Sequence, residues 1–192
     1  MTEAEKLKST LTAIFKRKGH DGRYTRLFEN LDPSQREFLL KEVSLHAGEL
    51  PVIGSAESQG NWLIVTTERI VWHLKGKTRT LSVHDVRHVK ADFPKMVVTG
   101  VRKDQLHELQ IETVGHEQCT IEVEEGAPLM GVWNALMNLG ARNRRTEKEQ
   151  SKVTGQTSAR HVTVQKCGAG LREVSPKLSQ TSPLSGASQA RT

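Results

Sequence analysis

The sequence predicts an α+β fold in which helices begin and end the folded part and short antiparallel strands fill its middle. Apolar residues recur at helical spacing in residues 3–18, 32–47 and 128–140, as on the buried face of an amphipathic helix. Between residues 61 and 123, apolar residues come in short β-branched runs or alternate with polar ones, which is typical of antiparallel strands with one solvated face. The chain of 192 residues is long enough for one ordinary domain with extensions.

The distribution of charge separates a folded part from a tail. The chain has 28 Lys and Arg against 22 Asp and Glu. Residues 148–192 hold seven of these bases and two of the acids, a net charge of +5, which leaves 21 bases and 20 acids to residues 1–147. The tail has twelve Ser or Thr and no aromatic residue, so it lacks the apolar surface that would offset the entropy of ordering it. We expect a helical region at 1–48, a sheet domain at 49–145 and a disordered basic tail at 146–192.

Three helices are predicted before the strands. The first covers residues 3–18, and a short second helix is expected over residues 24–31. The third begins at the segment Asp-Pro-Ser-Gln, residues 32–35, which combines an N-cap, a proline at the first helical position and a capping-box glutamine. We expect this third helix to run to about Ala47 and to end at Gly48.

The strands follow from residue 49 onward. The segment Asn61–Leu74 predicts two strands joined by a tight turn near Thr67-Glu68, and Lys75-Gly76-Lys77 predicts the next turn. Further short strands are expected at 81–89, 96–98, 106–111 and 119–123. A closing helix is then predicted from Pro128, with Gly140 as its stop and an apolar stripe made of Leu129, Val132, Trp133 and Leu136.

Several protein classes are excluded or disfavoured by composition. No apolar run reaches the roughly 18 residues that a membrane span needs, and the first residues lack an apolar stretch followed by a cleavage site. Cys119 and Cys167 are too few for a disulfide framework or a complete structural zinc site. We expect a cytoplasmic protein in a reducing compartment.

The strand segments resemble the bacterial pleckstrin-homology-like (PH-like) and GRAM-type families. Trp62–Trp72 is similar to their strand-turn-strand of the form apolar-V-T-x-x-R-apolar, and Arg79–Val89 is similar to their S-L-x-D-I-x-x-V segment. The resemblance covers roughly residues 49–140. It implies an antiparallel barrel or orthogonal sandwich of about seven strands, closed by a C-terminal helix. It also implies recognition of proteins, peptides or lipid headgroups, with catalysis rare.

The candidate ligand-binding residues are Lys75, Lys77 and Arg79. In an extended strand these alternate positions point to one side, so three cations could meet a single anion. The spacing is similar to the K-x-K/R-x-R pattern of phosphoinositide-binding PH domains, although Gly76 suggests a turn that would separate the side chains. The alternative reading is a solvated hairpin tip.

No catalytic or metal-binding constellation is predicted. His84 and His88 are four residues apart, but on a strand such positions lie about 13 Å from each other. Cys119 falls on an apolar alternation, and the cluster Glu122, Glu124 and Glu125 is typical of a solvated face. We therefore expect no catalytic residue, no metal and no cofactor.

The expected function is that of a non-enzymatic PH-like module binding a protein or peptide. We expect an extended peptide to enter a groove between a strand edge and the C-terminal helix. The alternative is peripheral binding to anionic membrane lipids through the three bases and the tail, and enzymatic activity ranks third. Nucleic acid is not expected as a partner, because residues 1–147 are nearly neutral and the three tryptophans fall on predicted core stripes.

Overall fold

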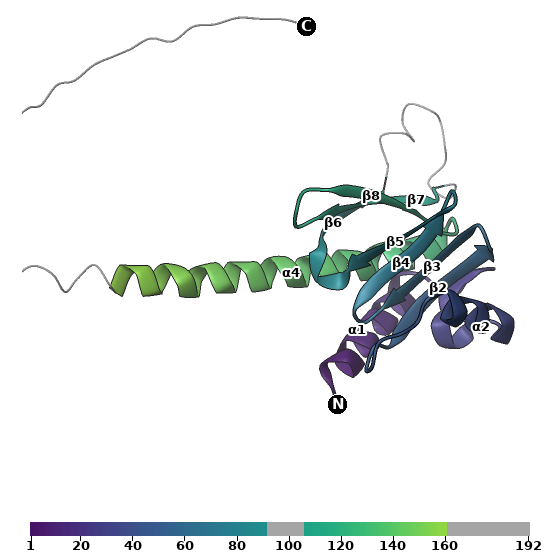
Figure 1. Ribbon diagram of the computed structural model, residues 1–192, viewed down its shortest axis with the longest axis horizontal. Coiled ribbons are helices and arrows are strands. Elements are labelled where there is room, and N and C mark those ends of the chain that lie inside the picture. Colours follow the sequence, from purple (N-terminus) through teal and green to yellow (C-terminus); the bar gives the residue numbers. More distant parts are fainter. Residues whose placement is uncertain (92–105, 161–192) are drawn as a thin grey trace, which may run out of the picture. The chain divides into compact units, whose positions relative to one another are not determined.

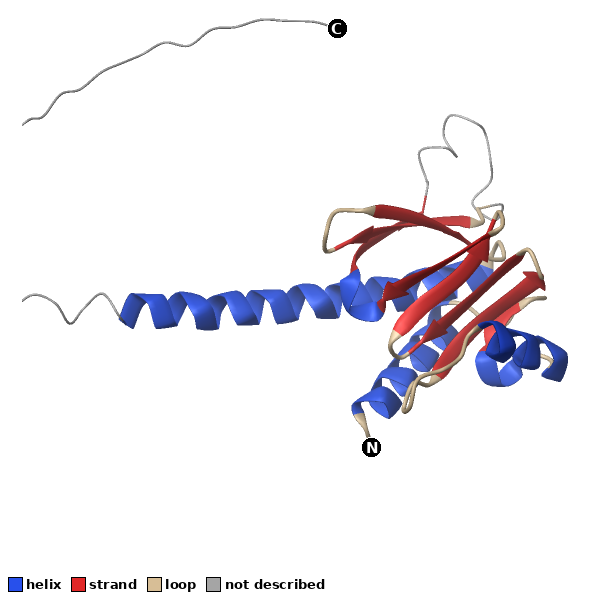
Figure 2. Ribbon diagram, viewed as in Figure 1, coloured by secondary structure: helices blue, strands red, loops and turns tan. Residues whose placement is uncertain are grey.

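The structure, a computed structural model, describes residues 1–91 and 106–160, with side chains through residue 150. Residues Met1–Thr154 form one compact unit of α+β architecture. Helices precede two antiparallel sheets, one of five strands in the order β1-β2-β3-β4-β5 and one of three in the order β6-β7-β8, and a helix follows them (Figure 2). Among the described residues, no strand pairing joins the two sheets into a closed barrel.

The first helix, α1 (Glu3–Lys18), forms where the sequence predicts it. Its N-terminus is held by a capping box, in which Glu5 N donates to Thr2 Oγ1 at 3.2 Å and Thr2 N donates to Glu5 Oε2 at 2.7 Å. Leu7, Leu11 and Phe15 are buried on one face of α1. These side chains belong to the same core cluster as the two sheets and the C-terminal helix, so α1 is an integral part of the fold.

The prediction of a helix over residues 24–31 is wrong. This segment forms the short strand β1 (Thr25–Leu27) and the single 3₁₀ turn η1 (Phe28–Asn30). The reason is non-local, because β1 pairs with β2 and the buried Thr25 hydroxyl lies 2.7 Å from the hydroxyl of Ser55.

The next helix, α2 (Pro33–Glu42), starts as predicted but ends five residues before Ala47. At Val43 the backbone turns to an extended conformation, and the Val43 side chain is buried against the sheet. The helix therefore ends where Val43 becomes buried and does not continue to Gly48. Gly48 lies in the following loop with a positive φ of 86°.

The five-stranded sheet contains β2 (Pro51–Ser58), β3 (Asn61–Thr66), β4 (Arg69–Leu74) and β5 (Lys77–Ser82) beside β1. The predicted strand pair and its turn at Thr67-Glu68 are confirmed as β3 and β4. Side chains alternate between the two faces of this sheet. One face packs against α2 through Trp62, Ile64 and Val71, and the other contributes Leu63, Val65, Ile70 and Trp72 to the main core.

The three-stranded sheet contains β6 (Val86–Ala91), β7 (Glu108–Thr113) and β8 (Gln118–Glu122), preceded by the 3₁₀ turn η2 (Val83–Asp85). The predicted strands at 106–111 and 119–123 are confirmed with small shifts of boundary. The predicted strand at 96–98 lies outside the described residues.

The closing helix α4 (Ala127–Arg160) is much longer than predicted. Gly140 does not end it. A Cβ at Gly140 would lie 2.5 Å from the carbonyl oxygen of Arg87, so this glycine permits close packing of α4 on β6. The helix α4 also includes residues 146–160, which the sequence assigns to the basic tail. The remainder of that tail lies outside the described residues.

The sheets and helices stack in layers around the five-stranded sheet. Figure 1 shows α2 on one side of this sheet, and α1 and the three-stranded sheet away from α2. The smaller core between α2 and the sheet is separate from the main core that α1, α4 and both sheets share. The hairpin ends of β2–β3 and β4–β5 remain exposed, with β8 close to β3 and β4.

Candidate ligand-binding site

The three bases singled out by the sequence surround one pocket. Lys75 and Gly76 form the two-residue turn between β4 and β5, with φ values of 53° and 74°. Such a turn twists the chain in the sense that an antiparallel hairpin requires. β5 then pairs with β4 so that Lys77 lies opposite Leu74 and Arg79 opposite Trp72. The turn suggested by Gly76 therefore exists, and it does not separate the three side chains.

The pocket has a volume of about 400 Å³ and is bordered by the β4–β5 hairpin of one sheet and by β8 of the other. Lys75, Lys77 and Arg79 border it from the β4–β5 hairpin, and Trp72 and Leu74 provide apolar surface. Three residues of β8 complete the lining, namely Gln118, Cys119 and Thr120. Gln118 and Thr120 are neutral polar residues on the β8 side of the pocket, opposite the three cations.

The arrangement gathers three cations at one place on the surface. Lys75, Lys77 and Arg79 are exposed, and none of them forms an ion pair within the described ranges. Lys77 and Arg79 share a sheet face with Leu81, which packs against the main core. The two cations thus occupy positions that would be apolar if the core extended to the end of the hairpin. The pocket is suited to bind carboxylate or phosphate groups.

The cysteine of the pocket is not an activated thiol. Burial raises the pKa of Cys119, while the nearby Arg79 acts in the opposite direction. The Sγ atom lies 3.7 Å from the carbonyl oxygen of Ile111, to which it donates a weak hydrogen bond. A protonated, half-buried thiol is a poor nucleophile, so Cys119 contributes surface to the pocket.

Two strand edges flank the pocket. β5 ends the strand order of its sheet, and β8 ends that of the other sheet. The antiparallel pattern points the backbone groups of Thr78 and Thr80 away from β4, and those of Gln118 and Thr120 away from β7. An incoming extended segment would therefore find both backbone hydrogen-bonding groups and cationic side chains at this place.

The groove expected between a strand edge and the C-terminal helix is closed at β6. Trp133 Nε1 of α4 donates to the carbonyl oxygen of Val89 at 3.1 Å, and Arg144 donates to that of Arg87. Asn143 Nδ2 donates to the carbonyl oxygens of Val83 and Val86, each at 2.8 Å. Because α4 already occupies these acceptors, a peptide cannot use this edge of β6 without displacing the helix.

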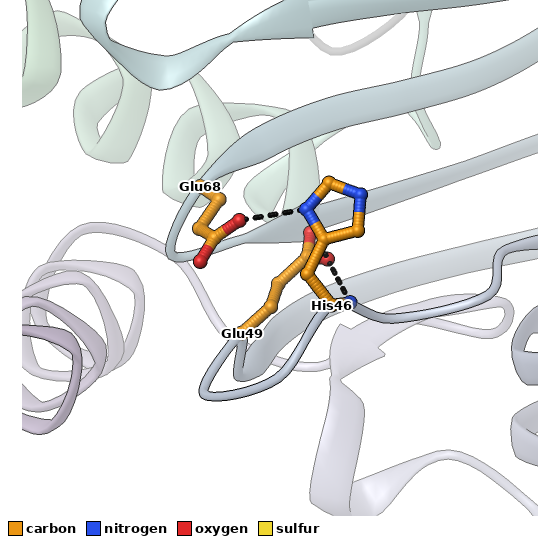
Figure 3. A group of neighbouring side chains, drawn as sticks. All are labelled: His46, Glu49 and Glu68. Carbon is orange, nitrogen blue, oxygen red and sulfur yellow. Dashed lines mark hydrogen bonds and ion pairs between the residues drawn. The ribbon is translucent and has the colours of Figure 1, made fainter.

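A second cluster of polar side chains lies where the loop after α2 meets the β3–β4 turn (Figure 3). His46 Nδ1 is 2.9 Å from Glu68 Oε2 and 3.8 Å from Glu49 Oε2, so one ligand atom from each residue falls within 4.8 Å of the others. This spacing would suit a metal ion. Whether the three residues can bind one depends on whether the Glu49 carboxylate is free of other hydrogen bonds.

The Glu49 carboxylate is fully occupied by donors. Its Oε1 accepts from Thr66 Oγ1 at 2.6 Å and from Arg69 Nε at 3.0 Å. Its Oε2 accepts from His46 N at 2.8 Å and from Arg69 Nη2 at 3.1 Å. Burial alone would raise the pKa of Glu49, but Arg69, the His46 amide and Thr66 together lower it. Each carboxylate oxygen of Glu49 accepts two hydrogen bonds. The cluster therefore has a structural role, which is to fix the loop to the β3–β4 turn.

The histidine pair noticed in the sequence does not form a site. His84 lies in η2, whereas His88 lies on β6 with its Nδ1 atom 3.4 Å from Arg144 Nη1. The nearby guanidinium opposes binding of a cation at His88.

The contribution of β8 to the pocket was not predicted. Gln118 and Thr120 lie about 40 residues from the bases, and only the packing of two sheets brings them together. The signal available in the sequence was the presence of Lys77 and Arg79 at positions where strand alternation favours apolar residues.

No protein-family model, curated protein or solved structure matches the chain. In the described ranges, no helix combines the length and the apolar character needed to cross a membrane.

Proposed function

We propose that this chain is a non-enzymatic PH-like binding module that takes an acidic segment of a protein partner into the basic pocket between β5 and β8. The observation that carries the proposal is the gathering of Lys75, Lys77 and Arg79 around one pocket, exposed and without an acidic partner among the described residues. The proposed location is the cytoplasm, on the grounds of the composition discussed above.

The order of elements supports the PH-like part of the proposal. The resemblance at residues 49–140 implies about seven antiparallel strands followed by a helix. In the described part of that range, four strands (β2–β5) and three strands (β6–β8) form two sheets, and α4 follows. The strand β1 and the helices α1 and α2 are additions that the resemblance does not cover.

The strand edges support an extended peptide as the ligand. A peptide that pairs with the edge of β5 or β8 gains main-chain hydrogen bonds, while side-chain pockets provide the selectivity. Carboxylates on the peptide would meet Lys77 and Arg79, and an arginine can bind a carboxylate through two parallel hydrogen bonds. The apolar surface of Trp72 and Leu74 would contact the aliphatic parts of the same peptide.

The test is peptide binding measured by fluorescence anisotropy. We expect a labelled nine-residue peptide containing two adjacent glutamates to bind the full chain, and Lys77→Glu or Arg79→Glu to weaken binding by about tenfold or more, because each reversal places like charges together. Lys41→Glu is the matched control, since Lys41 is exposed on α2, which covers the opposite face of the sheet. Equal affinities for the wild type and Lys77→Glu would refute the proposal.

An anionic lipid headgroup is the second candidate ligand. The observation that favours it is the position of Lys75 in the exposed turn of a hairpin, from which a cation can approach a flat surface. Sedimentation with anionic and neutral liposomes distinguishes the two ligands. At physiological salt, a membrane module would pellet only with anionic liposomes and lose this binding in Lys77→Glu, whereas a peptide module would bind the acidic peptide and remain in the supernatant.

A further inference from the structure

An acidic pocket adjoins the basic one along the same strand. It has a volume of about 380 Å³ and is lined by four glutamates and one arginine together with polar and aromatic side chains. The glutamates are Glu57 at the end of β2, Glu122 on β8, and Glu124 and Glu125 in the segment that follows β8. The bases of the basic pocket thus lie near the start of β8, and the glutamates of the acidic pocket lie near its end.

The register of the sheet shows that the two pockets are neighbours. Asn61 lines the acidic pocket and Leu74 lines the basic pocket, and these two residues are paired directly across β3 and β4. Asn61 Nδ2 also donates to Glu122 at 3.1 Å, which connects β3 to β8. Cys119 on β8 lines the basic pocket, and Val123, the residue after β8, lines the acidic one. These residues are four positions apart, a distance of about 13 Å in extended chain.

The carboxylates of the acidic pocket differ in whether they are free to bind a ligand. Glu124 accepts from the backbone amides of Arg23, Tyr24 and Thr25 at 2.6, 2.9 and 2.8 Å, so it serves to build the wall of the pocket. Glu57 and Glu125 are exposed at its mouth. Burial raises the pKa of Tyr24, and the carboxylates of Glu57, Glu124 and Glu125 raise it further, as expected for a pocket of negative potential.

We propose that the two pockets form one groove of opposite charges, and that the partner is an extended segment carrying acidic residues and, about four positions away, basic residues. This inference rests on the proposed function, because the acidic end of the partner occupies the basic pocket described above. Within the described residues, no ion pair joins the cations of one pocket to the carboxylates of the other, so the three bases and the exposed carboxylates of Glu57 and Glu125 are available to a ligand that spans them. A segment that carries charges of one sign only would be attracted by one pocket and repelled by the other.

The test compares two nine-residue peptides on the full chain at low ionic strength. The bipolar peptide has glutamates at positions 2 and 3 and lysines at positions 6 and 7, and the acid-only peptide has serines in place of the lysines. We expect the bipolar peptide to bind about threefold to tenfold more tightly, the usual range for one or two exposed charge pairs. In the double variant Glu57→Gln/Glu125→Gln, this advantage should disappear while the affinity for the acid-only peptide is retained or increased.

Controls separate this inference from the proposed function. The double variant Glu29→Gln/Glu42→Gln makes the same charge change at exposed positions of η1 and α2, and it should keep the advantage of the bipolar peptide. Equal binding of the two peptides by the wild type would overturn the bipolar groove and leave the basic pocket standing. If neither peptide binds, the proposed function fails as well. Retained or increased binding of the acid-only peptide by Glu57→Gln/Glu125→Gln shows that this variant is folded.

Discussion

At the scale of single residues, Glu49 contributes more to the stability of the fold than is usual for a loop residue. Its side chain is 0% exposed and forms an ion pair with Arg69, whose side chain is 20% exposed. Arg69 also donates from Nη2 to the carbonyl oxygen of Ser44, so the pair holds the loop after α2 against β4. Removing one member of a buried pair leaves the other charge without compensation, which makes such residues sensitive to substitution.

We predict that Glu49→Gln destabilises the protein by about 3 kcal/mol, because Arg69 then lacks a counter-charge in a buried setting. Urea unfolding followed by tryptophan fluorescence measures the change. Glu68→Gln is the control, since the Glu68 side chain is 45% exposed and pairs with the exposed His46, and its loss should cost less than about 1 kcal/mol. Equal destabilisation by the two variants would contradict the structural role assigned to Glu49.

The same carboxylate predicts how stability depends on pH. The pKa of Glu49 is lower in the folded state than its unfolded value of 4.5. A group of this kind contributes stability that is fully present above the unfolded pKa and is lost as the pH falls through the folded pKa. We therefore expect the wild type to lose stability below about pH 4.5 more steeply than Glu49→Gln, as measured by urea unfolding at a series of acid pH values. Parallel curves for the two proteins would be inconsistent with this assignment.

At the scale of elements, the crossing of α1 and α4 depends on glycine. A Cβ at Gly19 would lie 2.7 Å from the Cα and N atoms of Gly131 and would also contact the carbonyl oxygen of Ala127. Backbone atoms cannot move aside as a side chain can, so Gly19→Ala should force the end of α1 away from α4. We predict a loss of about 1–3 kcal/mol, measured as a lower midpoint of thermal unfolding. Gly60→Ala, whose Cβ would meet only Ser58 Oγ at 3.9 Å, should change the midpoint little.

The elements also show where sequence patterns are sufficient and where they are not. Local signals located α1 and the start of α2, and strand alternation located β3, β4, β7 and β8. The errors occur where a distant contact decides the structure. Gly140 is needed for the approach of α4 to β6, and residues 25–27 form a strand because β2 is available to pair with them. Neither contact is visible in a local window of sequence.

The candidate site was predictable to a similar extent. The alternation rule identified Lys75, Lys77 and Arg79, and the structure gathers them around one pocket. Their neighbours on β8 depend on how two sheets pack, which the spacing of residues within one strand does not specify. For the same reason the cluster Glu122, Glu124 and Glu125 suggested only a solvated face, whereas in the structure these residues line a pocket next to the bases.

At the scale of the whole molecule, the compact unit and the rest of the chain differ in charge. Residues 155–192 hold five Lys or Arg and one acid, whereas residues 1–154 hold 23 Lys or Arg and 21 Asp or Glu. Basic residues attract anionic surfaces without requiring a pocket, and salt screens this attraction over a Debye length of about 8 Å at physiological ionic strength. Loose adhesion to membranes and selective binding of a peptide should therefore be separable properties of this protein.

We predict that removing residues 155–192 abolishes sedimentation with anionic liposomes but leaves binding of the acidic peptide unchanged. The compact unit Met1–Thr154 retains both pockets, since every residue that lines them lies within it. The full chain should be released from liposomes when salt is raised from low to physiological concentration, because its attraction is electrostatic and long-ranged. The opposite outcome is that the shortened chain still pellets with anionic liposomes and that Lys77→Glu prevents this sedimentation. The basic pocket would then bind lipid headgroups, and membrane binding would replace peptide binding as the proposed function.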